Sequence, residues 1–79
     1  MNIIFSGSCS LDDTIYDYSG IYTRRSGGTD WKAVVLNADV VCRPTGVIDD
    51  GLNEDEILEV IRRLIMQSIE DVVGPPGAR

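Results

Sequence analysis

The most constraining feature of this sequence is a helical segment that carries its own start and stop signals. Asn53 is a favoured N-cap residue, and Glu56 stands three positions later, where its side chain can close a capping box. At the other end, the run Gly74-Pro75-Pro76 prevents a helix from continuing. We therefore predict one helix from Glu54 to Val73.

One face of the predicted helix is apolar, and the opposite face is polar. The residues that share the apolar face are Ile57, Ile61, Leu64, Ile65, Ile69 and Val72, and Leu58 widens it. This face is wider than one sheet requires. We expect either a loop or a second copy of the chain to cover its flank near Met66.

The first part of the chain has the composition of short β-strands. Residues 2–5 predict a strand, and the polar residues 6–13 predict a loop. Residues 14–18 and 21–25 predict two strands that are joined by a tight turn at Ser19-Gly20, because glycine accepts positive φ. Gly27-Gly28 then breaks the chain again.

Residues 30–43 form the main strand region, with apolar residues at period two from Lys32 to Cys42. This pattern fits one long strand or a hairpin that turns at Asn37-Ala38, and we favour the hairpin because strands of typical length are shorter. The run Pro44-Thr45-Gly46 should end the strand.

Together these elements predict an α+β fold, in which a small antiparallel sheet of three to five strands packs on one C-terminal α-helix. We expect residues 1–73 to form a single domain and residues 74–79 to form a flexible tail. A chain of 79 residues has a small core, so a homodimer is one way to bury more surface.

The composition argues against several classes of function. The chain has no histidine, which removes histidine-based catalysis and the usual zinc ligand sets, and we predict no catalytic residues, no metal and no cofactor. No apolar run approaches the roughly 20 residues of a membrane-spanning helix, and the first residues lack the features of a secretion signal. We therefore expect a cytoplasmic protein in which Cys9 and Cys42 are reduced.

Charge is the feature of the composition that stands out. The net charge is −6, and residues 44–59 contain six acidic residues and no basic residue. These candidate partner-binding residues are Asp49, Asp50, Glu54, Asp55, Glu56 and Glu59. Acidic residues in a first helical turn are favoured by the helix dipole, which explains three of the six without any partner. A second acidic group at Asp12 and Asp13 would extend the same surface if the fold brings it close.

The basic residues also cluster, at Arg24, Arg25, Lys32 and Arg43, among tyrosines and a tryptophan. Such a mixture on a sheet can bind single-stranded nucleic acid. We favour instead a cross-strand pair between Asp17 and Arg24 and a core built from Trp31 and tyrosines. The negative net charge also disfavours direct binding to nucleic acid or to an anionic membrane.

A short, strongly acidic chain with the run Asp49–Glu59 resembles the small inhibitors that bacteriophages encode, among them the anti-CRISPR proteins of the type I class. That resemblance implies an inhibitor that occupies a basic groove on a nucleic-acid-binding complex in the host cytoplasm. The strand Ile3-Ile4-Phe5 and the segment Val34–Ala38 also resemble small bacterial β-β-α domains. We therefore expect a non-enzymatic, protein-binding inhibitor. The alternative is an accessory domain whose acidic face serves only solubility.

Overall fold

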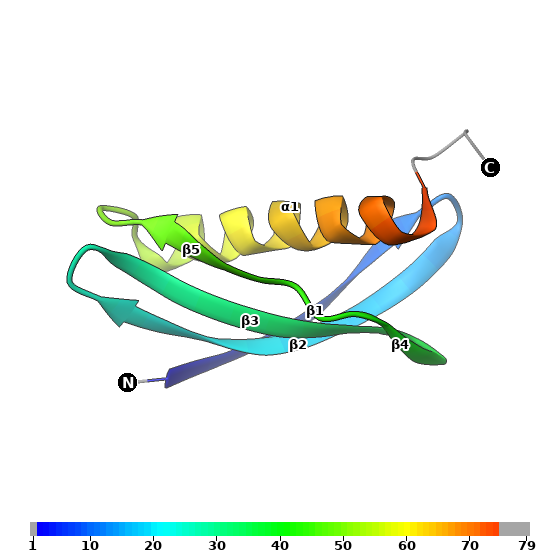
Figure 1. The fold of residues 1–79 in the computed structure, drawn as a ribbon, viewed down its shortest axis with the longest axis horizontal. Coiled ribbons are helices and arrows are strands. Elements are labelled where there is room, and N and C mark those ends of the chain that lie inside the picture. Colours follow the sequence, from blue (N-terminus) through cyan, green and yellow to red (C-terminus); the bar gives the residue numbers. More distant parts are fainter. Residues whose placement is uncertain (1, 75–79) are drawn as a thin grey trace.

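The chain folds into a curved antiparallel sheet with one helix lying along one face (Figure 1). The computed structural model describes residues 2–74. The elements in chain order are β1 (Asn2–Leu11), β2 (Thr14–Arg25), β3 (Gly28–Asn37), β4 (Asp39–Cys42), β5 (Thr45–Asp49) and α1 (Glu54–Val73). The predicted α+β fold, with a small antiparallel sheet and one C-terminal helix, is confirmed. Of the predicted tail 74–79, residues 75–79 lie outside the described residues.

The sheet has one regular edge and one interrupted edge. The strand order is β1-β2-β3-β4, and β5 pairs with β3 along the same edge as β4. Between β4 and β5, the N–H of Ala33 donates a hydrogen bond of 3.0 Å to the carbonyl oxygen of Pro44, which continues the ladder across the gap. The predicted end of the strand is confirmed, because β4 ends at Cys42, just before Pro44. The sequence did not predict the further strand β5, which begins at Thr45 and pairs with β3.

The first hairpin is longer than the sequence predicts. The predicted loop at residues 6–13 is mostly strand, because β1 continues to Leu11 and pairs with β2 along its whole length. The turn consists of Asp12 and Asp13 alone, whose φ angles of 55° and 64° are those of a two-residue hairpin turn. Asp-Asp lacks the glycine that usually marks this turn, which is why the sequence pattern missed it.

β2 runs without a break through Gly20, so the predicted turn at Ser19-Gly20 is wrong. Gly20 serves close packing instead of a turn. A Cβ atom at this position would lie 2.8 Å from Cζ of Phe5 and 2.8 Å from Cα of Ala33. The bare backbone therefore lets the Phe5 ring lie flat over its cross-strand partner Gly20.

The other two hairpins follow the sequence. A break is confirmed at Gly27, where the Ser26-Gly27 turn joins the paired residues Arg25 and Gly28. The hairpin that we favoured at Asn37-Ala38 is also confirmed, since β3 ends at Asn37 and β4 begins at Asp39. Ala38 adopts φ 65°, a left-handed conformation that is unfavourable for alanine.

The helix begins and ends where the sequence predicts. The Asn53 side chain accepts a 2.9 Å hydrogen bond from the backbone N–H of Glu56, and the Asn53 N–H donates one of 3.1 Å to the Glu56 carboxylate. This is the predicted capping box. At the other end, the N–H of Gly74 donates to the carbonyl oxygen of Glu70 at 2.8 Å.

The buried face of α1 is narrower than predicted. Four isoleucines at successive intervals of four residues form its contact with the sheet, and they are Ile57, Ile61, Ile65 and Ile69. Leu64 and Val72 were also expected on this face, but they are 40% and 58% exposed. A single ridge of branched side chains fills the space above the aromatic residues of the sheet, so the flanking positions remain outside. Met66, by contrast, is half-buried and packs against the core.

Candidate functional site

The tyrosine and tryptophan rings of the sheet pack on the face that α1 covers, and two of the basic residues lie on the other face. Tyr16, Tyr22 and Trp31 point toward α1 and are at most 4% exposed. Lys32 and Arg25 alternate with these residues along the strands, so they lie on the opposite face. Bases of nucleic acid stack on exposed aromatic rings, and these three rings are buried, so the sheet offers no stacking surface formed by them.

The predicted ion pair between Asp17 and Arg24 is wrong. Asp17 stands opposite Leu36 in the ladder, whereas Arg24 stands opposite Thr29 near the other end of β2. Arg24 instead donates a 2.6 Å hydrogen bond from Nη2 to the carbonyl oxygen of Leu52, at the entrance to the helix.

The six acidic residues of the run gather around the start of α1, and we call this region the acidic end (Asp49, Asp50, Glu54, Asp55, Glu56 and Glu59). All six are exposed. Their roles differ, because Glu56 belongs to the capping box while Asp49 and Asp50 precede the helix at the end of β5. Only Glu54, Asp55 and Glu59 line the groove beside α1 that is described next.

Asp12 and Asp13 lie elsewhere. The turn that they form between β1 and β2 is beside the C-terminal end of α1, at the opposite end of the molecule from the acidic end (Figure 1). The fold therefore does not bring the two acidic groups together, and Asp12 and Asp13 do not extend the acidic end.

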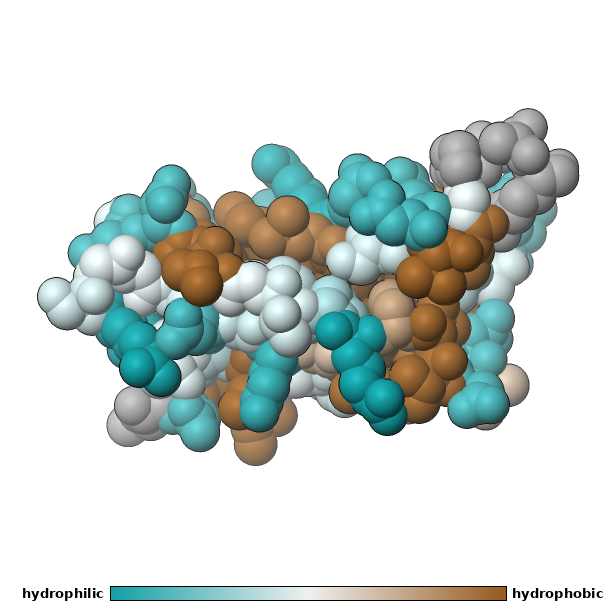
Figure 2. Space-filling model, viewed as in Figure 1, coloured by the Kyte–Doolittle hydropathy of each residue, from teal (hydrophilic) through white to brown (hydrophobic). Residues whose placement is uncertain are grey.

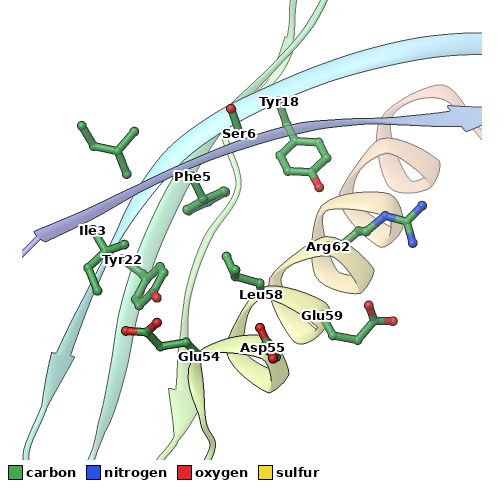
Figure 3. A pocket seen from close by; sticks show the side chains of 11 residues that line it. Ile3, Phe5, Ser6, Tyr18, Tyr22, Glu54, Asp55, Leu58, Glu59 and Arg62 are labelled. Carbon is green, nitrogen blue, oxygen red and sulfur yellow. The ribbon is translucent and has the colours of Figure 1, made fainter.

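A groove of about 460 Å³ separates β1 from the N-terminal half of α1 (Figure 3). Its lining residues are Ile3, Ile4, Phe5, Ser6, Tyr18, Tyr22, Glu54, Asp55, Leu58, Glu59 and Arg62. Three aromatic rings form a row on the sheet side, with ring centroids 6.2 Å apart for Phe5 and Tyr18 and 6.3 Å apart for Phe5 and Tyr22. On the helix side, Leu58 is 39% exposed, so it adds apolar surface to the groove.

The helix side of the groove carries more negative than positive charge. The charged residues of α1 that line the groove are three acidic ones, Glu54, Asp55 and Glu59, and one basic one, Arg62. Within residues 2–74, Glu54 and Asp55 form no ion pair, and Glu59 forms an exposed one of 3.3 Å with Arg63. Exposed pairs of this kind contribute little to stability, so the carboxylates remain available to a cationic partner.

Burial raises the pKa of three side chains, which are Tyr22 in the groove and the thiols Cys9 and Cys42. Burial raises the pKa of Tyr22, and the negative charge of Glu54 raises it further, while Arg24 acts in the opposite direction. Burial also raises the pKa of the Cys9 thiol, which the positive charge of Arg62 partly opposes. Cys9 and Cys42 are both free thiols, and burial raises the pKa of Cys42 as well. Raised thiol pKa values make both cysteines poor nucleophiles near neutral pH.

Among residues 2–74, no cluster of three or more histidine, cysteine, aspartate or glutamate side chains is placed to hold a metal ion. None of the described helices has the length and apolar character needed to cross a membrane. The groove itself combines apolar surface with carboxylates. This arrangement is suited to binding a cationic and partly apolar ligand.

Comparison of the chain with protein-family models, with curated proteins and with solved structures finds no match. Sequence analysis found the acidic half of the groove, but it missed the half formed by Phe5, Tyr18 and Tyr22. The available signal was the alternation of tyrosines with other residues in β2, but this pattern does not reveal which strand lies beside the helix.

Proposed function

We propose that this protein is a non-enzymatic binding module that docks its acidic end onto a basic surface of a partner protein or nucleoprotein complex. The observation that supports this most is a groove that combines apolar surface with two carboxylates, Glu54 and Asp55, that form no ion pair within residues 2–74. Protein interfaces commonly combine an apolar centre with a charged rim. Helix capping accounts for Glu56, but it does not require the groove or Glu59.

A basic surface that accepts this module is also a surface that can hold nucleic acid, because both ligands are anionic. We therefore propose that docking excludes nucleic acid from the partner. This is the activity that the resemblance to type I anti-CRISPR proteins implies, and it places the module in the cytoplasm of the host cell. The competing proposal is an accessory domain whose acidic end provides only solubility.

Two matched charge variants distinguish these proposals. Asp55→Lys with Glu59→Lys alters the groove, whereas Asp17→Lys with Asp71→Lys alters exposed sites outside it. Each pair replaces two negative charges with two positive ones, which changes the net charge from −6 to −2. Circular dichroism checks that both variants fold.

Affinity capture from a host lysate then compares the parent with the two variants at low and high salt. We expect a partner that the parent and the control variant retain, that the groove variant loses, and that high salt releases. Adding the parent protein should also displace nucleic acid from the purified partner. Equal capture by both variants, or displacement that the groove variant still performs, would contradict the proposal.

A further inference from the structure

Resting on the proposed function, we infer that the basic partner binds as an extended segment, which pairs with the free edge of β1 and fills the adjoining groove. The segment would place an apolar side chain and a lysine or arginine, two positions apart, on the side that faces α1. This inference concerns the form of the ligand, and its test distinguishes a failure of strand pairing from a failure of charge-based docking.

The edge formed by β1 is open and regular. Within residues 2–74, β1 pairs only with β2, and the register continues without a bulge from Asn2 to Leu11. In an antiparallel ladder, every second residue of an edge strand turns its N–H and carbonyl groups outward. A strand of ten residues therefore presents a row of unused hydrogen-bonding groups to a ligand.

The two edges of the sheet differ in their protection. Natural proteins protect edge strands from pairing with charged side chains, proline, bulges or short strands. The opposite edge has such features, because it is divided into β4 and β5, contains Pro44 and has a register shift opposite Val35 and Leu36. Residues 2–11 contain no charged residue and no proline. The lack of protection on β1 is the pattern expected of an edge that is used for binding.

The groove lies on the side of this edge that faces the helix. Ile3 and Phe5 come from β1 itself, and Leu58 lies on the opposite wall of the groove, on α1 (Figure 3). A strand added to β1 continues the sheet, so its alternate side chains point to the same face as Phe5. An apolar side chain on that face would cover Leu58, which is 39% exposed in the free protein.

Charge complementarity determines the rest of the segment. Side chains two positions apart in a strand lie on the same face and are separated by about 6.6–6.8 Å. The residue two positions from the apolar one therefore reaches another part of the groove. Glu54, Asp55 and Glu59 line that wall, which favours lysine or arginine there. A second copy of this chain is a poorer occupant, because each copy has a net charge of −6 and would bring its acidic end with it.

The probe for this inference is the synthetic peptide acetyl-Lys-Thr-Val-Thr-Lys-Thr-Val-Thr-Lys-amide, which alternates lysine and valine on one face. Two further peptides of the same sequence carry N-methyl groups on the odd or on the even amides. Because only alternate amides bond to a neighbouring strand, we expect one methylated peptide to bind at least tenfold more weakly and the other to bind within about threefold of the parent peptide. Hydrogen exchange of amides in residues 2–11 should slow in the complex.

Two leucine variants provide the matched control in the protein. Leu58 and Leu64 are 39% and 40% exposed on the same helix, but only Leu58 lines the groove. We expect Leu58→Lys to weaken binding of the parent peptide at least tenfold and Leu64→Lys to leave it within about twofold. If both leucine variants bind alike, the groove is not the site and the inference is overturned.

The outcomes also separate this inference from the proposed function. If both methylated peptides bind as well as the parent peptide, while Asp55→Lys with Glu59→Lys abolishes binding, pairing with β1 is refuted and charge-based docking stands. If the affinity for the peptide changes neither with salt nor in the variant Asp55→Lys with Glu59→Lys, the proposed function fails instead. A dimer formed through β1 without any peptide, detected by protection of residues 2–11 that increases with protein concentration, would also overturn the inference.

Discussion

At the scale of single residues, this fold depends on positions where an unusual backbone or an absent side chain is required. Gly20 allows the Phe5 ring to lie over the sheet, and Gly7 does the same for its cross-strand partner Tyr18, whose hydroxyl oxygen would lie 2.6 Å from a Cβ at Gly7. Both rings belong to the aromatic row of the groove. These glycines therefore shape the groove as well as the sheet.

Ala38 provides a test of backbone strain. Its φ of 65° is unfavourable for a residue with a Cβ atom, and glycine removes that cost. Ala38→Gly should therefore increase the free energy of unfolding by about 0.5–1 kcal/mol, after the larger entropy loss of glycine is included. Urea denaturation measures the change. In the matched control, Ala33→Gly, in a buried strand position, should destabilise the protein, and a destabilised Ala38→Gly variant would refute the assigned turn.

Tyr22 provides a test of the electrostatics beside the groove. Its pKa is raised in the folded protein, so above the ordinary tyrosine pKa of about 10 the unfolded chain ionises before the folded one does. Unfolding then releases a proton, and stability decreases as the pH rises. Stability should be unaffected by this group below that range.

Tyr22→Phe should make this alkaline decrease shallower without removing it. Cys9 and Cys42 also have raised pKa values and contribute in the same direction from about pH 8.5 upward. Urea denaturation between pH 8 and pH 11 compares the two proteins. Identical pH dependence in the parent and in Tyr22→Phe would show that the Tyr22 hydroxyl is not buried as described.

At the scale of elements, local signals were sufficient for some boundaries and insufficient for others. The helix was predictable because Asn53, Glu56 and Gly74 determine its ends through contacts within a few residues. The lengths of β1 and β2 were not predictable, since Gly20 suggests a turn to any local rule while its actual role is a contact with Phe5 on another strand. Tertiary packing overrode the local preference.

The helix face is tested by a pair of substitutions to alanine. Ile61 is 1% exposed and Leu64 is 40% exposed, although their sequence positions made both candidates for the core. Ile61→Ala should cost about 2–5 kcal/mol of stability, because it leaves a cavity, whereas Leu64→Ala should cost less than about 1 kcal/mol. Chemical denaturation decides, and similar costs for both variants would mean that the helix is rotated from its described position.

At the scale of the whole molecule, one helix covers one face of the sheet and leaves the other open. Ile4, Ile15 and Val47 are 80%, 66% and 71% exposed, and apolar patches reach the surface in the view of Figure 2. From the sequence we expected excess apolar surface near Met66, and the structure has it on the open face of the sheet instead. Hydrophobic periodicity indicates which residues share an apolar face, but it does not indicate which face of the sheet the helix covers. The groove was unpredictable for the same reason, since it joins residues about 50 positions apart.

Self-association through the open face is therefore the next prediction. Burial of apolar side chains would drive it and repulsion between acidic chains would oppose it, so association should increase with salt. Light scattering in reducing buffer should detect dimers at high micromolar concentration, and Ile4→Lys with Val47→Lys should remove them. A strict monomer at high salt would contradict this prediction, and a dimer present only without reductant would indicate a disulfide.

The proposed function requires the groove at the acidic end to bind a basic partner surface. Equilibrium affinities of the captured partner for three purified proteins test it most directly: the parent, the groove variant Asp55→Lys with Glu59→Lys, and the control variant Asp17→Lys with Asp71→Lys. Both variants have the same net charge of −2, because each replaces two acidic residues with lysines and so raises the net charge of −6 by four. We predict that the groove variant binds at least 30-fold more weakly, that the control variant binds within about threefold of the parent, and that salt weakens the parent's binding. Equal weakening of the two variants would show that only net charge matters and would contradict the claim.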